Sequence, residues 1–379
     1  MLNKSEFQDH LLNDLIPFWN NLCDNECGGF YGNVDSENKI NKNAGKSAVL
    51  QTRILWFYSS CYKLLGDKDL LKTAGSQFDF ITDYMTDPED GGIYLEVERD
   101  GKIKDNKKHT YALAFSLYSI SAYYSAGKSE AAFKAANKLF DLIENKFRDE
   151  YGYTEPHIFD KRGFKFERTM NTLLHIIEAY AEYYQAVKSE KARSALEYAL
   201  NLVIDKAYNE NLSRIECYFD KFMNPVGDVL SYGHDIESSW LIYRACVILG
   251  NHGIKNNLSP KLEKIAQNVI SKGFVNGGMN GIYYDCAGGI ENKLRSWWVM
   301  AEAVVALVHR YNLYGGCQSI ILAENLWEYI KKFFISPYGE WYGHMDDNGE
   351  LIKKSGDLCG AWKCPYHNGR MCIEMINML

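Results

Sequence analysis

Three polar residues meet in the segment YGHDIESSW, residues 232–240, where a glycine precedes an apolar helical run. His234 and Glu237 are three positions apart and therefore share one face of a helix. Such a pair can act as a base with its orienting carboxylate, or as half of a metal site that other helices complete. The segment also fits an ordinary helix start, in which Asp235 caps the helix and His234 has no chemical role. The segment alone leaves these three interpretations open.

A second candidate lies in AWKCPYHNGRMC, residues 361–372, where His367 follows the rigid turn at Pro365 and opens the last helical segment. This arrangement suits a positioned acid or base, and it is equally compatible with an ordinary capped helix start.

Arg53 is the clearest anomaly, because it lies within the apolar segment QTRILWF. A buried arginine is rarely unpaired, so we expect Arg53 to meet a carboxylate such as Glu237 or Glu302, or to bind a substrate oxygen.

A glycine-aromatic turn recurs along the chain, in sequences such as CGGFYG, DGGIYLEV and YGEWYG, and a weaker relative has serine in place of the glycine. The steps between successive turns are 63, 60, 61, 68 and 58 residues, which indicates a sixfold repeat of about sixty residues. The residues that mark the turns are Gly29, Gly92, Gly152, Ser213, Gly281 and Gly339.

Helical periodicity gives two segments per repeat. The twelve predicted segments are 5–22, 47–65, 68–86, 108–127, 130–147, 169–187, 190–207, 234–250, 259–273, 296–314, 318–335 and 366–378. The even-numbered segments are apolar almost all round, whereas the odd ones are amphipathic, so the even helices should form an inner ring and the odd ones an outer ring. The sequence therefore predicts an all-α fold, an (α/α)6 barrel of twelve helices, with short β-hairpins at one end. We expect residues 1–379 to form one catalytic domain.

The polar residues that do not belong in a buried helix gather near the N-terminal ends of the even segments. Buried ionisable groups are costly unless they are paired or used, so this convergence at one mouth of the barrel favours a functional site. The residues are Arg53, Tyr111, Asn171, His175, His234, Glu237, Trp298, Glu302, Trp362 and His367.

Four further histidines, His157, His252, His309 and His344, fall outside this pattern and are expected to have surface or core roles. We expect Trp297 to fill the core, and Trp298 and Trp362 to be candidate platforms for a pyranose ring.

Composition excludes several classes of function. The net charge of −7 and the absence of a basic stripe argue against nucleic-acid binding. Residues 109–127 carry no formal charge, but four serines and four tyrosines interrupt them, so we expect a buried helix and no membrane span. The N-terminus lacks the pattern of a secretory signal, and the ten cysteines are dispersed without a C-x-x-C pair, which favours reduced thiols in the cytoplasm. We find no nucleotide-binding motif, and expect no cofactor and no metal.

At these residues the chain resembles the N-acylglucosamine 2-epimerase superfamily. The resemblance runs nearly end to end, through blocks such as LQTRILWFYSSCY, KKHTYALAFSLY, TMNTLLHIIEAY, SYGHDIESSWLI and WKCPYHNGRMC, and is strongest toward members that act on cellobiose. It implies an (α/α)6 barrel that needs no cofactor and acts on a reducing-end sugar. The expected reaction inverts C2 of the reducing-end glucose in β-1,4-linked disaccharides such as cellobiose and lactose, by ring opening and proton transfer through an enediolate.

The resemblance also implies roles for individual residues. His234 and His367 would be the two acid/base histidines, and Glu237 would orient His234. The remaining expected residues bind or support the sugar, and they are Arg53, Tyr111, Asn171, His175, Trp298, Glu302 and Trp362. The expected partner is a small disaccharide, and the expected assembly is a monomer or weak homo-oligomer.

Four alternatives remain open at this point. The chain could be a monosaccharide or N-acylglucosamine 2-epimerase, or an aldose–ketose isomerase of the same superfamily. It could be an (α/α)6 glycoside hydrolase that uses Glu237 and Glu302 as its two carboxylates. It could be a non-catalytic sugar-binding protein. A zinc-dependent enzyme that uses His234 with Glu237 is the fourth possibility.

Overall fold

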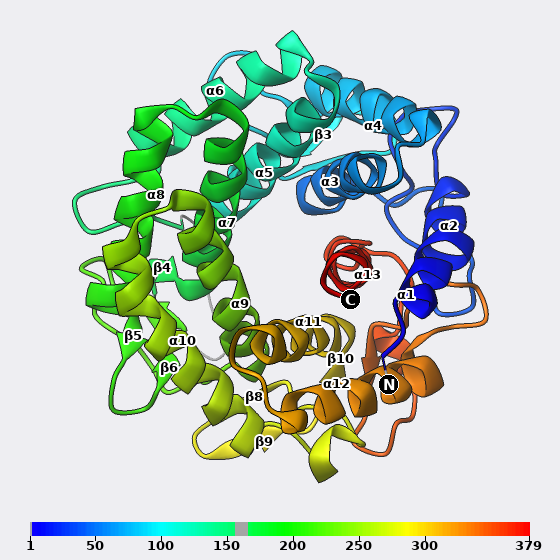
Figure 1. Ribbon diagram of the computed structural model, residues 1–379. Helices are drawn as coiled ribbons and strands as arrows, with labels where there is room; N and C mark the ends of the chain where they lie inside the picture. Colours follow the sequence, from blue (N-terminus) through cyan, green and yellow to red (C-terminus); the bar gives the residue numbers. More distant parts are fainter. Residues whose placement is uncertain (1, 156–165) are drawn as a thin grey trace.

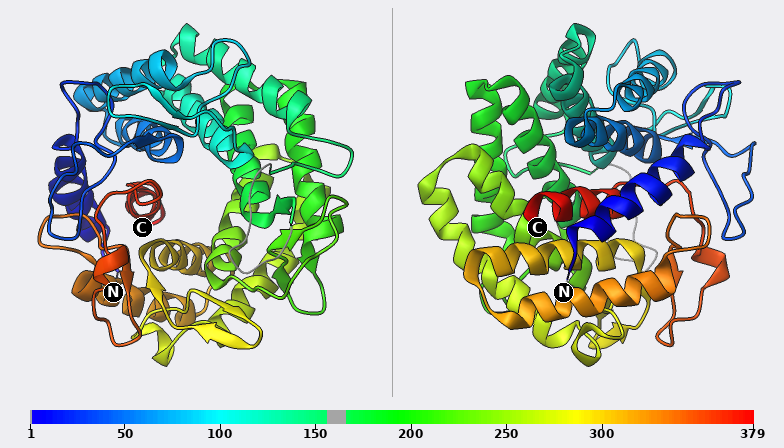
Figure 2. Two further views of the ribbon diagram at one scale, coloured as in Figure 1. Left: turned by 180° about the vertical axis from the view of Figure 1, so that it is seen from behind. Right: turned by 45° about the vertical axis from the view of Figure 1, so that its right-hand side comes forward.

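Six helices form the inner ring of the barrel in the computed structural model, which describes residues 2–155 and 166–379. Each inner helix packs against the next, and the last packs against the first, so the ring is closed. Figure 2 shows the same ring from behind and from an oblique direction. The inner helices are α3 (Ala48–Leu65), α5 (Thr110–Gly127), α7 (Met170–Val187), α9 (Tyr232–Leu249), α11 (Trp297–Tyr314) and α13 (His367–Met378).

The outer ring surrounds these helices and consists of the segments between them. Four outer helices contain or end in a π-helical turn, at Leu11–Leu15, Ile81–Met85, Val203–Ala207 and Ile330–Phe334. The outer segments are α1 (Lys4–His10) with α2 (Ile16–Asn20), α4 (Lys68–Phe80), α6 (Glu130–Lys146), α8 (Glu190–Leu202), α10 (His252–Lys272) and α12 (Cys317–Tyr329).

The two rings differ in burial as the sequence pattern predicts. Nearly every residue in the first two thirds of α5 and α11 is buried, because these helices are covered by neighbours on all sides. In α6 only one stripe, which includes Ala132, Ala136 and Phe140, is buried. The predicted (α/α)6 barrel and its assignment of inner and outer helices are confirmed.

One predicted boundary is wrong by more than a few residues. The ninth helix was expected to begin at residue 259, next to Pro260, whereas α10 begins at His252 and contains Pro260 in its interior. Asn251 caps this helix by accepting the backbone N–H groups of Gly253 and Ile254. The cap and the buried face of α10 outweigh the single backbone hydrogen bond that proline removes.

Short antiparallel strands lie in the loops. Just before α3, α7 and α11 there is a two-residue strand that pairs with a later loop strand, as β1 with β2, β4 with β7 and β10 with β11. The strands are β1 (Lys46–Ser47), β2 (Glu96–Val97), β3 (Ile103–Asp105), β4 (Arg168–Thr169), β5 (Tyr208–Asn209), β6 (Arg214–Ile215), β7 (Tyr218–Phe219), β8 (Asp285–Ala287), β9 (Ile290–Asn292), β10 (Arg295–Ser296) and β11 (His344–Met345).

The recurring turn has a simple backbone requirement. All six marker residues have positive φ, including Ser213 at 49°, and each turn closes an antiparallel bridge. Glycine reaches this left-handed region without the steric cost that a side chain imposes. This requirement explains why five of the six repeats carry glycine at the marker position.

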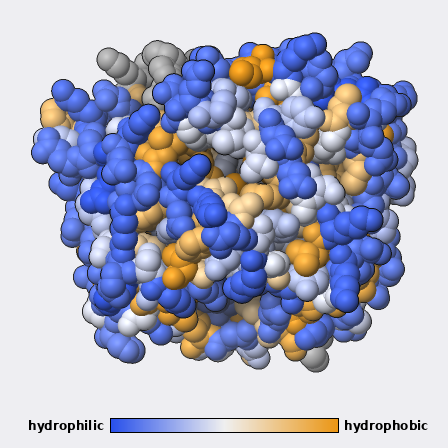
Figure 3. All heavy atoms as spheres, turned by 90° about the horizontal axis from the view of Figure 1, so that it is seen from above, coloured by the Kyte–Doolittle hydropathy of each residue, from blue (hydrophilic) through white to orange (hydrophobic). Residues whose placement is uncertain are grey.

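The face shown in Figure 3 is mainly hydrophilic, and apolar side chains gather around a hollow in it. A cavity of about 620 Å³ lies on the wall that α6 and the turn near Pro88 form. Among the described residues, its lining contains neither a histidine nor an aromatic residue. Within the described ranges, no helix is sufficiently long and apolar to cross a membrane.

Candidate active site

Two adjoining cavities open where the inner helices begin. The inner cavity has a volume of about 250 Å³ and the outer one about 330 Å³. Five residues line both, namely Tyr111, Asn171, His234, Tyr284 and Trp362. The structure therefore brings most of the predicted residues together, because the inner cavity is lined by Arg53, Tyr111, Asn171, His175, His234, Glu237, Tyr284, Trp297, Trp298, His344, Trp362 and His367.

His367 is held from behind by a carboxylate. Its Nδ1–H donates to Glu302 Oε1 at 2.7 Å, and the residue is only 5% exposed. The pKa of His367 is well below its usual value because of burial and the nearby positive charges of Arg53 and Arg370. A neutral ring that donates from Nδ1 keeps the lone pair of Nε2 free to accept a proton. Glu302, expected to support the sugar, instead lies fully buried behind His367 and does not line the cavity.

His234 has a neutral partner. Its Nδ1 lies 2.8 Å from the Ser231 hydroxyl oxygen, and this hydroxyl also accepts the backbone N–H of His234. Ser231 therefore caps α9, and Asp235 instead accepts the backbone N–H of Ile215. The expectation that Glu237 orients His234 is wrong, as is the alternative in which Asp235 caps the helix. Burial lowers the pKa of His234 to about 3.

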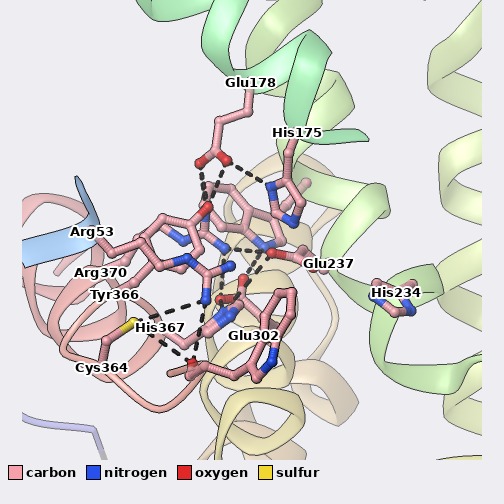
Figure 4. A network of polar contacts seen from close by, with 12 residues as sticks. Arg53, His175, Glu178, His234, Glu237, Glu302, Cys364, Tyr366, His367 and Arg370 are labelled. Carbon is pink, nitrogen blue, oxygen red and sulfur yellow. Dashed lines mark hydrogen bonds and ion pairs between the residues drawn. The ribbon is translucent and has the colours of Figure 1, made fainter. Parts of the chain in front are cut away.

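Arg370 was missed by sequence reasoning and lies at the centre of the polar network in Figure 4. Its Nη2 donates to Glu237 Oε1 at 2.6 Å and to Glu302 Oε1 at 2.7 Å, while Nη1 donates to Glu178 Oε1 at 2.5 Å. The guanidinium also lies over the Tyr366 ring, 4.2 Å from its centroid. One buried guanidinium is thus paired with three carboxylates, so the cluster contains more acidic groups than basic ones.

Glu237 has one oxygen available to a ligand. It lines the inner cavity, and while Oε1 accepts from Arg370, the buried Oε2 has no hydrogen-bond partner among the described residues. Burial and the neighbouring charge of Glu302 raise the pKa of Glu237, although Arg370 opposes the shift. A carboxyl group that is biased toward its protonated form can donate a hydrogen bond into the cavity.

Arg53 does not meet a carboxylate within the part of the chain that the structure describes. Its Nη2 donates to the Tyr111 hydroxyl at 2.6 Å, and its guanidinium lies 4.0 Å from the centroid of the Phe115 ring. Of the two expectations for Arg53, a carboxylate partner is therefore contradicted. Arg53 Nε and Asn171 Oδ1 are buried without a partner among the described residues. A ligand hydroxyl in the inner cavity would meet a fixed positive charge beside an unused acceptor.

His175 belongs to the His-x-x-Glu pair that does form. Its Nδ1 lies 2.9 Å from Glu178 Oε2, and burial lowers the pKa of His175 to about 4. Glu178 also accepts the Tyr366 hydroxyl, and Figure 4 shows its carboxylate in contact with both Tyr366 and His175. The sequence carried the same three-residue spacing here as at His234 and Glu237, so this signal could have been found.

Aromatic rings form much of the cavity wall. The Trp298 ring lies 4.8 Å from the His234 ring and 5.6 Å from the His367 ring, measured between centroids. Trp362 is 57% exposed and lines both cavities, so its face is available to a ligand. Trp297 and His344, expected in the core or on the surface, also line the inner cavity. His157 lies outside the described residues.

One group of ligating atoms is compact enough to consider for a metal. Glu237, Glu302 and His367 offer atoms within 4.8 Å of one another. Arg370 donates to both carboxylates and already supplies their positive charge, and His234 is not part of the group. The arrangement does not match the expected alternative, in which His234 and Glu237 would share zinc.

Comparisons with known proteins agree with this architecture. The sequence profile of the N-acylglucosamine 2-epimerase (GlcNAc 2-epimerase) family matches residues 29–368. The chain is 39% identical to a cellobiose 2-epimerase of Ruminococcus albus, over 98% of each chain. It superimposes with a TM-score of 0.95 on a sugar epimerase from a ruminal bacterium, at 38% identity over 99% of this chain and 98% of that chain. The TM-score is also 0.95 for a cellobiose 2-epimerase from Bacillus thermoamylovorans, at 31% identity over 99% of each chain.

Proposed function

The chain belongs to the N-acylglucosamine 2-epimerase family and is a carbohydrate epimerase, and we propose that it inverts C2 of the reducing-end glucose in β-1,4-linked disaccharides such as cellobiose. One observation carries this proposal. Two imidazoles, His234 and His367, line the same cavity, and the Nδ1 atom of each forms a hydrogen bond with another side chain of the protein. This arrangement leaves both Nε2 atoms to exchange protons with a bound sugar.

The reaction begins with an aldose whose ring has opened. One histidine removes the proton from C2, which is acidified by the C1 carbonyl, and the electron pair passes to the carbonyl oxygen to give an enediolate. The other histidine, which carries a proton on Nε2 when the reaction begins, donates that proton to the opposite face of C2 and inverts that carbon alone. The first histidine keeps the proton taken from C2, and proton exchange with solvent resets both rings after the product leaves. Arg53 and the N-terminal ends of the inner helices place positive charge where the enediolate oxygen develops negative charge.

The two histidines differ in their capacity to hold the abstracted proton. The imidazolium of His367 would be stabilised by the Glu302 carboxylate, whereas His234 has only the hydroxyl of Ser231. A charge-assisted hydrogen bond is about twice as strong as a neutral one. We therefore propose that the Glu302 carboxylate offsets the lowering of the His367 pKa by burial, Arg53 and Arg370, and we assign the stronger base to His367.

The adjoining cavities suit a sugar of two rings. The reacting unit would occupy the inner cavity beside both histidines, and the second unit would extend into the outer cavity. Trp362 lines both cavities and could pack against the apolar face of a pyranose at their junction. Lactose has the same reducing-end glucose and is proposed as a further substrate.

A hydrolase is less well supported by the geometry. Two catalytic carboxylates must flank the scissile bond of a glycoside. Here Glu237 and Glu302 do not face each other across the cavity, because both Oε1 atoms accept from Nη2 of Arg370 and Glu302 does not line the cavity.

The test is incubation of the purified protein with cellobiose in D2O, with a chelator and no added cofactor, followed by NMR of the C2 position. Deuterium at C2 in a new mannose-ended disaccharide is the expected result. A ketose product would instead indicate delivery of the proton to C1, and free glucose would indicate hydrolysis. Intact cellobiose without exchange would refute the disaccharide assignment.

A further inference from the structure

A polar stripe runs along the inner face of α7, well beyond the cavities described above. Asn171, His175, Glu178 and Glu182 follow one another at steps of four, three and four residues, which places them on one face of the helix. The last three are nearly buried, at 2%, 6% and 7% exposure. Carboxylates are costly to bury below a binding site unless they are paired or used.

The opposite end of the barrel has its own pocket. This rear pocket has a volume of about 240 Å³ and lies among residues from the middle and C-terminal parts of inner helices, including Lys63, Tyr118, Glu182, Arg244 and Glu374. Its charged groups pair with one another, as Arg244 does with Glu374 and Lys63 with Glu182. The rear pocket is therefore polar without an excess of one charge.

A small hollow adjoins the rear pocket on the side of Glu178, and we call it the connecting hollow. The connecting hollow shares Tyr118, Glu182 and Arg244 with the rear pocket, and it is also lined by Glu178. Its volume of about 10 Å³ is close to the space that one water molecule needs. Glu178 lines neither the inner nor the outer cavity.

His175 lies between the inner cavity and Glu178. It lines the inner cavity, and its Nδ1 lies 2.9 Å from Glu178 Oε2. From these contacts we propose that the hollow and the rear pocket form a water passage through which His175 and Glu178 exchange protons with bulk solvent. The passage works from the far end of the barrel and stays open when a sugar fills the front cavities.

The proton balance of such an exchange is simple. A sugar hydroxyl loses its proton to Nε2 of His175, while the proton on Nδ1 moves to Glu178 and then to water in the hollow. The sugar oxygen keeps the electron pair, and Arg53, which lines the same cavity, stabilises the charge. Burial alone would raise the pKa of Glu178, but the charge of Arg370 lowers it to about 2, so the carboxyl releases a proton readily to water. The reverse sequence returns a proton.

The test compares two isosteric substitutions in the rear pocket. Glu182→Gln removes a carboxylate that lines both the hollow and the pocket, whereas Glu374→Gln makes the same chemical change in the pocket but outside the hollow. The measurement is the exchange rate of the His175 Nδ1–H by NMR, in the free protein and with the reduced sugar alcohol of cellobiose bound. Ala245→Val, which narrows the hollow, provides an independent block.

We expect exchange in the wild-type protein to persist with the alcohol bound, to slow at least about tenfold in Glu182→Gln and Ala245→Val, and to stay within about twofold in Glu374→Gln. Loss of exchange in the wild type when the alcohol binds would show that the front is the only route and would overturn the passage. So would equal rates in the two glutamine variants.

The choice of the reduced sugar alcohol of cellobiose as the ligand rests on the proposed function. Its binding to the protein is measured separately by tryptophan fluorescence. Failure to bind would count against the proposed function alone. The passage would then be judged in the free protein, where equal exchange in the two glutamine variants would overturn it.

Discussion

Substitution of Glu302 by glutamine tests the assignment of His367 as the stronger base. The change keeps the shape of the side chain but removes the charge that faces His367 Nδ1 at 2.7 Å. A hydrogen bond to a charged group contributes about 1.5–3 kcal/mol. At 1.36 kcal/mol for each factor of ten, we expect kcat to fall about 13- to 160-fold. Glu302 does not line the cavity, so KM should change little.

The comparison is Ser231→Ala, which removes the neutral partner of His234. A neutral hydrogen bond contributes about 0.5–1.5 kcal/mol, so the expected loss is about 2- to 13-fold. The assay is the initial rate of deuterium incorporation at C2 of cellobiose, and thermal unfolding checks that both variants are folded. The reasoning is refuted if Glu302→Gln keeps more than about a third of kcat, if its loss appears in KM, or if Ser231→Ala loses more.

Three further predictions follow from the same geometry. A Cβ on Gly233 would lie 2.4 Å from the Trp298 ring, so Gly233→Ala should displace that ring. We expect kcat to fall about 10- to 100-fold while the circular dichroism spectrum stays unchanged. A near-normal kcat would contradict this prediction. Trp362→Ala should raise KM for cellobiose by about 2- to 13-fold. It should leave the unfolding temperature unchanged, because Trp362 is 57% exposed. A change in the unfolding temperature alone would count against a sugar platform. The unfolded chain binds a proton at His175 near pH 6.5, whereas the folded chain does so near pH 4, so stability should fall as the pH drops through this window. Urea unfolding should show a shallower fall in His175→Asn, and parallel pH profiles for the two proteins would contradict this.

The sequence determined the fold to a large extent, because the relevant information is periodic and local. A stretch such as residues 297–308 is apolar on every face and can only be stable inside the ring, whereas the stripe of Ala132, Ala136 and Phe140 requires one buried side. The recurring glycine likewise reports a local requirement, since the turn needs positive φ. These constraints act within a few residues and can be read directly from the chain.

The sequence also indicated which residues meet, because polar groups at the starts of inner helices must converge on one mouth. It did not determine how they pair. The spacing of His234 and Glu237 suggested a contact, but on the closed barrel Glu237 turns to Arg370, which lies 133 positions away in the chain. His367 is paired with Glu302, 65 positions away.

Only the tertiary structure decided these pairings, for an electrostatic reason. Three carboxylates on α7, α9 and α11 approach one another in a buried space, and the guanidinium of Arg370 on α13 is paired with all three of them. Which carboxylate then remains for a histidine depends on the distances between helices from different repeats. Spacing along one helix fixes the face on which a side chain lies, but the partner on the neighbouring helix is set by how the ring closes.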